Sequence, residues 1–368
     1  MISNVICNSA KQGLIPQREY FDKDIANSDN TNGYYIIESN DFVYNPRKSA
    51  DAPYGPISSY QYPEAGIVSP LYLCFRAKRE INPLYFEWYF RSSTWHRYIY
   101  MSGDSGARHD RVSIKDDVFF AMPINVPSAK EQEKISLFLD VIERRIETQR
   151  TLVETLKKYK RGVISALLSS KTNPYYSPET WKEVALCDVA SGFEYGMNAA
   201  ATVYDGSHKY IRITDIDDNS HLYSQNVPVS PEGQVDEKYR VRENDILFAR
   251  TGASVGKSYR YQRSDGDLYY AGFLIRIHVN SDVNCGYVFQ NTLTEAYRRW
   301  VLLESARSGQ PGINADQYKQ YRFLLPPLEL QNKISTLATN LDNLICKEEN
   351  LLSQIEQVKI ALLQRLFI

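Results

Sequence analysis

The chain carries one sequence segment twice, and this duplication limits the possible folds more than any other feature. Residues 127–169 align without a gap with residues 326–368, so that Gln132 matches Gln331 and Lys160 matches Lys359 (331 − 132 = 199). A repeated unit generally indicates a repeated or pseudo-symmetric fold. With 368 residues, the chain is long enough for two domains that each bury a core. We therefore predict a chain made of two similar halves.

Each copy of the repeat has the pattern of one long amphipathic helix. Apolar residues recur every three, four or seven positions, charged residues occupy the other faces, and no proline interrupts the helix. A helix over residues 129–169 would extend ~60 Å and act as a spacer. We expect the two helices to pack on each other, although a simple helical bundle has the same pattern. The expected packing residues are Ile135, Ile142, Ile146, Leu156, Ile334, Leu341, Leu344, Leu351 and Ile355.

The sequence outside the repeat has the pattern of two mixed α/β domains, with short strands first and a helix after them in each half. Prolines before each long helix favour extended backbone and mark a domain boundary twice. The expected strands and helices lie at 41–45, 68–75 and 83–100 in the first half, and at 209–213, 245–249, 258–261, 273–279 and 287–306 in the second.

These patterns predict an α+β fold with two mixed α/β domains separated by two long helices. The predicted segments are a first domain at 1–126, a spacer helix at 127–170, a second domain at 171–325 and a second spacer helix at 326–368.

The most informative motif between the helices is Thr-Gly-Ala-Ser-Val-Gly-Lys at residues 251–257, directly after an expected strand. A nucleotide-binding loop needs four residues between its first glycine and its Gly-Lys pair. Only three residues separate Gly252 from Gly256, so ATP binding is not predicted. Glycines permit close approach to DNA, and cations beside aromatic residues suit nucleic acids. A turn with solvated charges is the alternative. The candidate DNA-binding residues are Arg250 and Lys257 first, then Thr251, Gly252, Ser254, Tyr259 and Arg260, with Tyr44, Asn45, Arg47, Lys48 and Arg108 in the first half.

Composition narrows the remaining classes. The formal net charge of −1 gives no global indication of nucleic-acid binding, so such a role depends on local clusters. The five cysteines are widely spaced, which favours a reducing compartment over a zinc site or a disulfide framework. The sequence shows neither a signal peptide nor an apolar run of ~20 residues. We therefore expect a cytoplasmic protein that makes no membrane contact.

The sequence contains no recognisable catalytic motif. Residues 173–176, Asn-Pro-Tyr-Tyr, lack the second proline of the Asn-Pro-Pro-Tyr loop that adenine methyltransferases use. No glycine-rich S-adenosylmethionine loop, G-x-S-x-G elbow or H-E-x-x-H pair is present. The five histidines are scattered, and Asp236 with Lys238 is only a weak match to a nuclease site. We expect a non-catalytic chain that binds neither a metal nor a cofactor.

Taken together, the repeat and the motifs resemble the specificity (S) subunits of type I restriction-modification systems. The resemblance rests on the duplicated Pro-x-x-x-x-Gln-x-Lys-Ile start of each helix, the turn at 251–257, the Ser-Gly-Gln-Pro-Gly turn at 308–312 and Trp181. It implies two target recognition domains that each read half of a split double-stranded DNA site. It also implies an antiparallel coiled coil that docks methyltransferase (M) subunits. Restriction/translocase (R) subunits are further expected partners, with S-adenosylmethionine, ATP and Mg on partner subunits.

The first domain departs from this pattern at its start. Trp181 precedes Asp245 by 64 positions (245 − 181), whereas Met1 precedes the aligned Asp41 by only 40 (41 − 1). We therefore expect an N-terminally shortened first domain and take the second domain as the DNA reader. A ~60 Å spacer brackets at most ~18 base pairs at ~3.4 Å each, which predicts two short half-sites. The alternatives are a scaffold without DNA specificity and a truncated, inactive specificity subunit.

Overall fold

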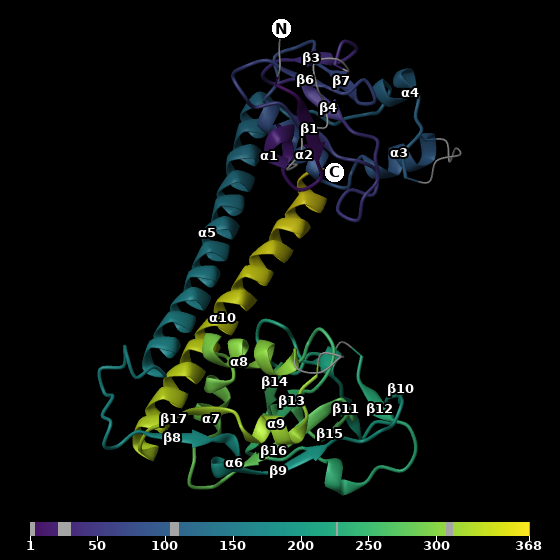
Figure 1. Cartoon of the computed structure of the whole chain (residues 1–368). Helices are drawn as coiled ribbons and strands as arrows, with labels where there is room; N and C mark the ends of the chain where they lie inside the picture. Colours follow the sequence, from purple (N-terminus) through teal and green to yellow (C-terminus); the bar gives the residue numbers. More distant parts are fainter. Residues whose placement is uncertain (1–3, 21–30, 104–109, 226, 307–311, 368) are drawn as a thin grey trace. The chain divides into compact units, whose positions relative to one another are not determined.

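The computed structural model describes residues 4–20, 31–103, 110–225, 227–306 and 312–367 (Figure 1). The chain forms two compact units. Unit 1 consists of Met1–Leu152 with Glu348–Ile368, and unit 2 consists of Val153–Lys347. Two long helices, α5 (Ala129–Leu167) and α10 (Leu328–Leu366), each contribute one part to each unit. The domain boundaries predicted at residues 126, 170 and 325 remain predictions.

Besides its parts of α5 and α10, unit 1 contains seven short strands and four short helices among its described residues. Its small three-stranded antiparallel sheet has the order β5-β4-β7, and helix α2 packs against it. In chain order these elements are β1 (Ile6–Ser9), β2 (Gly13–Pro16), α1 (Gln17–Tyr20), β3 (Tyr35–Ile37), β4 (Phe42–Tyr44), β5 (Ile57–Ser59), β6 (Gly66–Val68), β7 (Leu73–Phe75), α2 (Pro83–Arg91), α3 (His96–Ser102) and α4 (Asp116–Phe120).

Unit 2 is built on a four-stranded antiparallel sheet with the order β14-β13-β16-β9, whose strands are labelled in Figure 1. Three short 3-10 helices at 213–215, 237–239 and 263–265 connect its strands. In chain order its other elements are β8 (Lys182–Ala185), α6 (Leu186–Val189), β9 (Ala190–Tyr195), β10 (Ala201–Val203), β11 (Lys209–Ile211), β12 (Val229–Pro231), β13 (Asp245–Ala249), β14 (Ser258–Arg260), β15 (Leu268–Tyr270), β16 (Leu274–Val279), α7 (Cys285–Asn291), α8 (Glu295–Ser305), α9 (Ala315–Lys319) and β17 (Arg322–Leu325).

The central strands of the two sheets are structural equivalents. Strands β5-β4-β7 of unit 1 correspond to β14-β13-β16 of unit 2, with the central strand between antiparallel neighbours in both. The carboxylate of Asp41, just before β4, accepts a hydrogen bond from the Glu38 N–H at 2.7 Å. Asp245, the first residue of β13, does the same with the Arg242 N–H at 2.8 Å. The duplication therefore extends from the helices into the domains.

Both domain helices expected from the sequence are broken in two. The helix predicted at 83–100 is α2 followed by α3, and the helix predicted at 287–306 is α7 followed by α8. The Ser92 hydroxyl donates to the Tyr89 carbonyl at 2.6 Å, and the Thr292 hydroxyl donates to the Phe289 carbonyl at 2.7 Å. Side chains of this kind offer backbone groups an alternative to the helical ladder, which ends each first helix.

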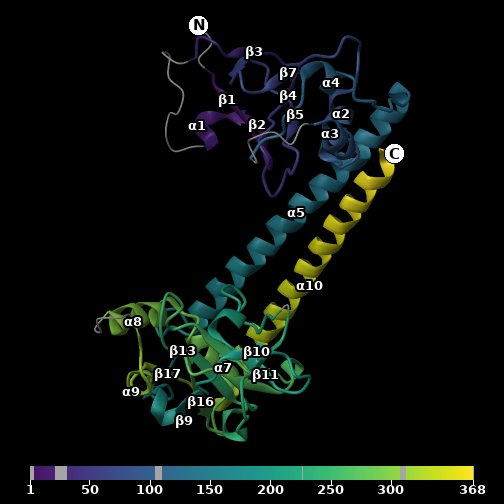
Figure 2. The same ribbon diagram turned by 90° about the vertical axis from the view of Figure 1, so that its right-hand side faces the viewer.

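Helices α5 and α10 pack against each other in antiparallel fashion within each unit, as the seam predicted (Figures 1 and 2). Ile146 and Ile334 are buried, and six other predicted positions are half-buried: Ile135, Ile142, Leu156, Leu341, Leu351 and Ile355. The prediction for Leu344 is wrong, because this side chain is 40% exposed and its neighbour Ile345 is 8% exposed. Heptad counting placed the seam one residue too early at this point, since a straight α-helix drifts relative to a seven-residue repeat.

Ion pairs between the helices repeat with the sequence. Lys160 contacts Asp342 at 2.5 Å in unit 2, and Lys359 contacts Glu143 at 2.6 Å in unit 1. Each residue of the first pair lies 199 positions from its counterpart in the second (359 − 160 and 342 − 143). Duplicated sequence therefore makes duplicated contacts.

A glutamine side chain joins each domain to the start of its long helix. In unit 1, Gln132 accepts a hydrogen bond from the Asn82 N–H at 3.3 Å and donates to the Pro127 carbonyl at 2.9 Å. In unit 2, Gln331 accepts from the Asn284 N–H at 2.9 Å and donates to the Pro326 carbonyl at 2.8 Å. Both glutamines are buried, where such groups need partners. This pairing accounts for the Pro-x-x-x-x-Gln spacing of the repeat.

Candidate nucleic-acid interface

The segment 251–257 forms the turn of the β13–β14 hairpin. Gly252 and Gly256 both have a positive φ, of 75° and 85°. A Cβ atom on Gly252 would meet open space, whereas one on Gly256 would lie 2.6 Å from the Val301 side chain on α8. Gly256 therefore serves packing within the domain, and Gly252 is the glycine that leaves the turn open on its outer side.

Arg250, at the start of this turn, is held between two aromatic rings. Its guanidinium carbon lies 5.1 Å from the centroid of Tyr195 and 5.7 Å from that of Phe273. Its Nε donates to the Gly272 carbonyl at 3.0 Å, which fixes the plane of the group. Among the described residues, no carboxylate forms an ion pair with Arg250. The structure thus orients this cation without neutralising it.

Backbone contacts gather several loops around Arg250. The Arg250 carbonyl accepts from the Ile313 N–H at 2.9 Å, and Thr251 forms an isolated bridge with Gly312. The Gly272 N–H donates to the Met197 carbonyl at 2.7 Å. The turn at 251–257, the β9–β10 connection and the turn before β16 therefore meet here. The rest of the predicted Ser-Gly-Gln-Pro-Gly turn, residues 308–311, lies outside the described residues.

The ammonium group of Lys257 is bound within the domain. Its Nζ donates to the Ile216 carbonyl at 2.9 Å and is paired with the Asp218 carboxylate. Only 11% of its side chain is exposed. The prediction that Lys257 binds DNA is therefore wrong for this conformation. Its ammonium group instead supports the neighbouring loop, and the sequence pattern alone does not reveal that Asp218 reaches it.

The other predicted residues of this hairpin have different environments. Tyr259 is fully buried, its hydroxyl donates to Asp265 at 2.5 Å, and burial raises its pKa, so its prediction as a DNA contact is wrong. Arg260 lies over the Phe289 ring at 5.8 Å, beside α7. Ser254 is half-buried and accepts the Lys257 N–H on its carbonyl at 3.0 Å. The structure brings Thr251, Gly252 and Ser254 together with Arg250 and leaves Arg260 apart.

The predicted DNA-binding residues of unit 1 also divide into buried and exposed side chains. Tyr44 is 1% exposed, stacks on Phe119 at 5.0 Å and donates to the Tyr54 carbonyl at 2.8 Å, so its prediction as a DNA contact is wrong. Asn45 is a turn residue whose side chain accepts from the Arg47 N–H at 3.0 Å. The pattern of aromatic and cationic neighbours did not separate core residues from surface residues, because strands alternate their faces.

Arg47 and Lys48 are exposed, and no carboxylate of the described residues pairs with them. Arg47 forms an isolated bridge with Arg111, and the Lys48 N–H donates to the Asp110 carbonyl at 2.8 Å. This bridge is the counterpart of the Thr251–Gly312 bridge in unit 2. Arg108 lies outside the described residues. Unit 1 therefore presents exposed cations at the place equivalent to the Arg250 turn.

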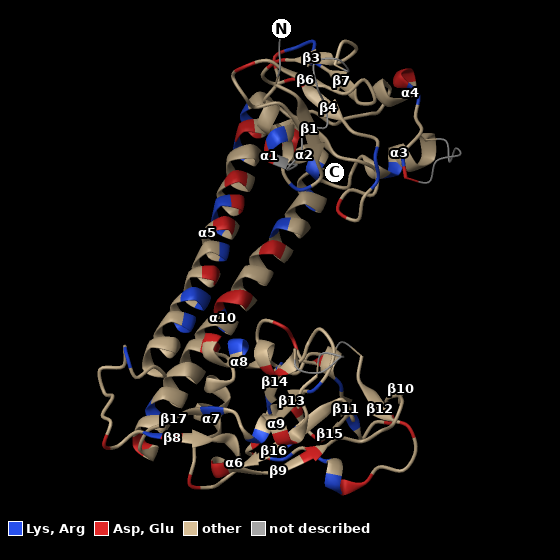
Figure 3. Cartoon of the chain, viewed as in Figure 1, with Lys and Arg blue, Asp and Glu red and all other residues tan. Residues whose placement is uncertain are grey.

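Most other cations near the hairpin of unit 2 are neutralised, and basic and acidic side chains are interleaved (Figure 3). Such exposed pairs lose most of their attraction for a distant phosphate. The paired cations are Arg212 with Asp215, Lys238 with Asp236, Arg240 with Asp267, Arg263 with Glu243 and Arg276 with Glu194.

Sequence reasoning missed the two rings that flank Arg250. Phe273 is 59% exposed and Tyr195 is 43% exposed. Phe273 was assigned to a strand, whereas β16 begins at Leu274 and Phe273 belongs to the turn. The sequence did contain a signal for an exposed ring at Phe273. An aromatic residue that directly follows a turn glycine, here Gly272, is not expected to be buried.

Comparison with known proteins shows which protein family this part of the chain matches. Residues 178–357 match the type I restriction modification DNA specificity domain. The type I restriction enzyme StySPI specificity subunit of Salmonella potsdam is 23% identical over 309 residues, covering 79% of this chain and 66% of that subunit. Residues 178–357 therefore carry a type I restriction modification DNA specificity domain. The matched region is thus slightly less than two thirds of the relative's length. These relatives are specificity subunits, which are non-catalytic, as predicted for this chain.

Two solved structures confirm the fold of this chain. A chain of a type I R-M system, solved in work on complex assembly and conformational transition, matches with a TM-score of 0.59 at 15% identity. The match covers 90% of this chain and 82% of that chain. The type I restriction-modification S subunit from M. genitalium matches with a TM-score of 0.52 at 14% identity, covering 94% and 87%. At these identities the likeness shows the fold alone.

Two further properties concern the described part of the chain. None of its described helices is long and apolar enough to cross a membrane. Within the same residues, no group of three or more His, Cys, Asp and Glu side chains is arranged to hold a metal ion.

Proposed function

We propose that this chain is the sequence-reading subunit of a type I restriction-modification complex and that unit 2 reads duplex DNA through the turn around Arg250. The observation that carries the proposal is the geometry of Arg250. It is an oriented cation with no ion-pair partner among the described residues, set between two partly exposed rings. The DNA specificity domain matched over residues 178–357 covers this turn.

The chemistry of Arg250 suits a base edge as well as a phosphate. Its Nε is bound to the Gly272 carbonyl, and the two Nη groups, with which no carboxylate of the described residues pairs, remain as donors. An arginine fork contacts O6 and N7 of guanine in the major groove, and a good bidentate contact contributes ~1–3 kcal/mol of discrimination. Thr251 and Gly252 lie beside it and allow a close approach of DNA.

Unit 1 is proposed to contribute contacts to the DNA backbone, and through them to a second half-site. Its exposed Arg47 and Lys48 occupy the place equivalent to the Arg250 turn. Lysine and arginine contacts to phosphates supply affinity that decreases as salt increases. A bipartite site with two short half-sites remains part of this proposal.

The partners of the chain are also proposed. Methyltransferase subunits would dock on the paired helices, where Leu137, Phe138 and Val141 of α5 are 50% to 61% exposed. Restriction/translocase subunits would join the same complex. S-adenosylmethionine would then be bound by the methyltransferase, and ATP and Mg would be used on partner subunits. Methyl transfer and cleavage would therefore take place on the partners.

The test compares three variants in the assembled complex with the methyltransferase. We expect Arg250→Ala to lower the affinity for the complex's own methylated motif about tenfold or more. Arg250→Lys keeps the charge but loses the planar fork, so it should retain binding to unrelated duplex while losing preference for the motif. Lys257→Ala should lower the melting temperature and weaken DNA binding less than Arg250→Ala does.

Fluorescence anisotropy at several salt concentrations measures the affinity of each complex for the motif and for unrelated duplex DNA. Wild-type affinity for the motif in Arg250→Ala would remove the proposed role of this residue. Absence of any salt-dependent binding to DNA by the wild-type complex would instead favour a scaffold without DNA specificity.

A further inference from the structure

Unit 1 has an open strand edge at the place where unit 2 has a paired one. In unit 2, β17 pairs with β8 in antiparallel fashion over Arg322–Leu325 and Lys182–Ala185. The equivalent segment of unit 1 is 123–126, with which none of the described residues forms a strand pair. The equivalence is structural too, because Tyr287 donates to the Leu324 carbonyl at 2.6 Å and Tyr85 donates to the Asn125 carbonyl at 3.4 Å.

Strand β7 of unit 1 also has an open edge, because it has a neighbouring strand on only one side among the described residues. Strand β16 of unit 2 lies between β13 and β9. Its equivalent, β7, pairs with β4 on one side, and no described strand pairs with it on the other. All three residues of β7 are half-buried, whereas four of the six residues of β16 are buried. In unit 2, one continuous segment, β8-α6-β9 at 182–195, covers both edges.

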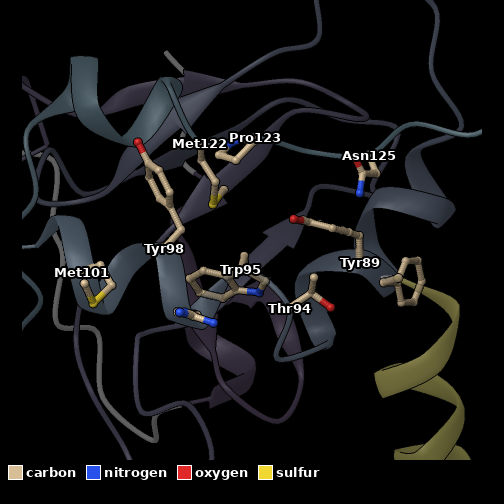
Figure 4. A pocket seen from close by; sticks show the side chains of 10 residues that line it. Tyr89, Thr94, Trp95, Tyr98, Met101, Met122, Pro123 and Asn125 are labelled. Carbon is tan, nitrogen blue, oxygen red and sulfur yellow. The ribbon is translucent and has the colours of Figure 1, made fainter.

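A mainly apolar cavity lies beside the open edge at 123–126 of unit 1. In unit 2, Leu186 and Val189 of α6 are buried in the core with Tyr297, Tyr318 and Phe323. In unit 1, a cavity of about 360 Å³ lies along 122–125, and Figure 4 shows Trp95, Tyr98, Met101, Met122 and Pro123 around it.

A second cavity, of about 460 Å³, adjoins the same segment near Val126 and Phe367. Val126 lines this cavity and Met101 lines the first one, and their side chains are 56% and 72% exposed.

We propose that unit 1 binds a strand–turn–strand segment of the kind found at 181–195, presented by a separate polypeptide chain. The partner's segment would add one strand to 123–126 and one to β7, and would place two branched aliphatic side chains in the cavities. The occupant is defined by the equivalent contacts of unit 2. Residues 181–195 of this chain are already used there, since Leu186 is 1% exposed and Val189 is 3% exposed.

The backbone positions that would bond are also defined. In unit 2 the Leu186 N–H donates to the Tyr321 carbonyl at 2.8 Å, and bonded pairs alternate along an antiparallel ladder. Phe323 and Leu325 therefore face β8, and their equivalents Ile124 and Val126 direct their peptide groups to the open edge. Main-chain hydrogen bonds of this type give affinity when a strand is added to a sheet, and side-chain pockets give specificity.

The experiment adds a fluorescent peptide with the sequence of residues 178–196 to the full chain. We expect saturable binding with one peptide per chain, and a rise in melting temperature. A peptide with an N-methyl group on the residue at position 184 keeps every side chain but loses one ladder donor, and should bind about tenfold more weakly. A scrambled peptide should not bind.

A variant of the protein assigns the site. Val126→Pro removes an N–H at the open edge, and Val126 is exposed and precedes Pro127, so the change is compatible with folding. Binding should weaken about tenfold or more in this variant. Two results would overturn the proposal: absence of saturable binding to the wild-type chain, or binding that neither Val126→Pro nor N-methylation weakens, which would indicate exchange into unit 2.

Discussion

Arg250 and Lys257 begin and end one hairpin turn, yet the structure gives them different roles. Arg250 lies between two aromatic rings without an acidic partner among the described residues, whereas Lys257 is bound to a carbonyl and to Asp218. The two cations looked alike in sequence because the distinguishing contacts come from residues that lie 23 to 55 positions away (273 − 250 and 250 − 195). Which residue types gather in the turn could be predicted, but which of them remain available to a ligand could not.

A pH effect belongs to the residue scale. Burial lowers the pKa of His221, and Lys257, Arg298 and Lys160 act in the same direction, whereas the hydrogen bond to the Ser258 carbonyl opposes them. As the pH decreases through about 6.5, His221 therefore takes up a proton in the unfolded chain before it does so in the folded chain, and stability falls below that pH.

We expect His221→Asn to reduce this loss, because asparagine tolerates the positive φ of 57° at this position. Urea unfolding at about pH 7.5 and about pH 5.5 measures the difference. His96, whose pKa burial also lowers, remains in both proteins and accounts for part of the decline. An equal decline in both proteins would show that His221 does not titrate as described.

At the scale of elements, the long helices were predictable and their contacts were predictable in part. Apolar periodicity gave both helices, which end within a few residues of the expected positions. It did not give Gln149, which is 1% exposed and donates to Glu348 across the helix pair at 2.6 Å. Apolar periodicity cannot reveal a polar residue in the interface between two helices. The hydrogen-bond partner of Gln149 also lies in the other copy of the repeat, far away in sequence.

The shift of the seam at Leu344 leads to a direct test. Ile345→Ala removes a buried side chain and should lower the free energy of unfolding by ~2–4 kcal/mol. Leu344→Ala changes a side chain that is 40% exposed, and the loss should be below ~1 kcal/mol. Chemical denaturation of both variants provides the comparison. Equal losses would mean that the seam passes through both positions.

At the scale of the whole molecule, the duplication was readable from sequence, together with a difference in spacing between the starts of the two halves. The sequence could not show which strand edges of unit 1 lack a neighbour among the described residues, or where its cavities lie, because both depend on which strands become neighbours after folding. The domain order and the mixed α/β character followed from local patterns, whereas the strand partners did not.

The proposed recognition function makes a prediction for the whole complex. When the chain is expressed with a methyltransferase subunit, single-molecule sequencing should detect adenine methylation in a motif with two short parts and an unread interval. A complex that assembles but methylates one continuous motif would show that a single unit reads DNA. A complex that assembles without methylation would identify an inactive first domain.

The repeated ion pairs also constrain how the lengths of these helices can change during evolution. Glu143 and Lys160 lie 17 positions apart on α5, and Asp342 and Lys359 lie 17 positions apart on α10 (160 − 143 and 359 − 342). A residue inserted between one pair of positions alone would bring Lys160 or Lys359 out of reach of its carboxylate. A matched insertion in both copies would keep both ion pairs in register, so we expect changes of length in this region to occur together in the two halves of the gene.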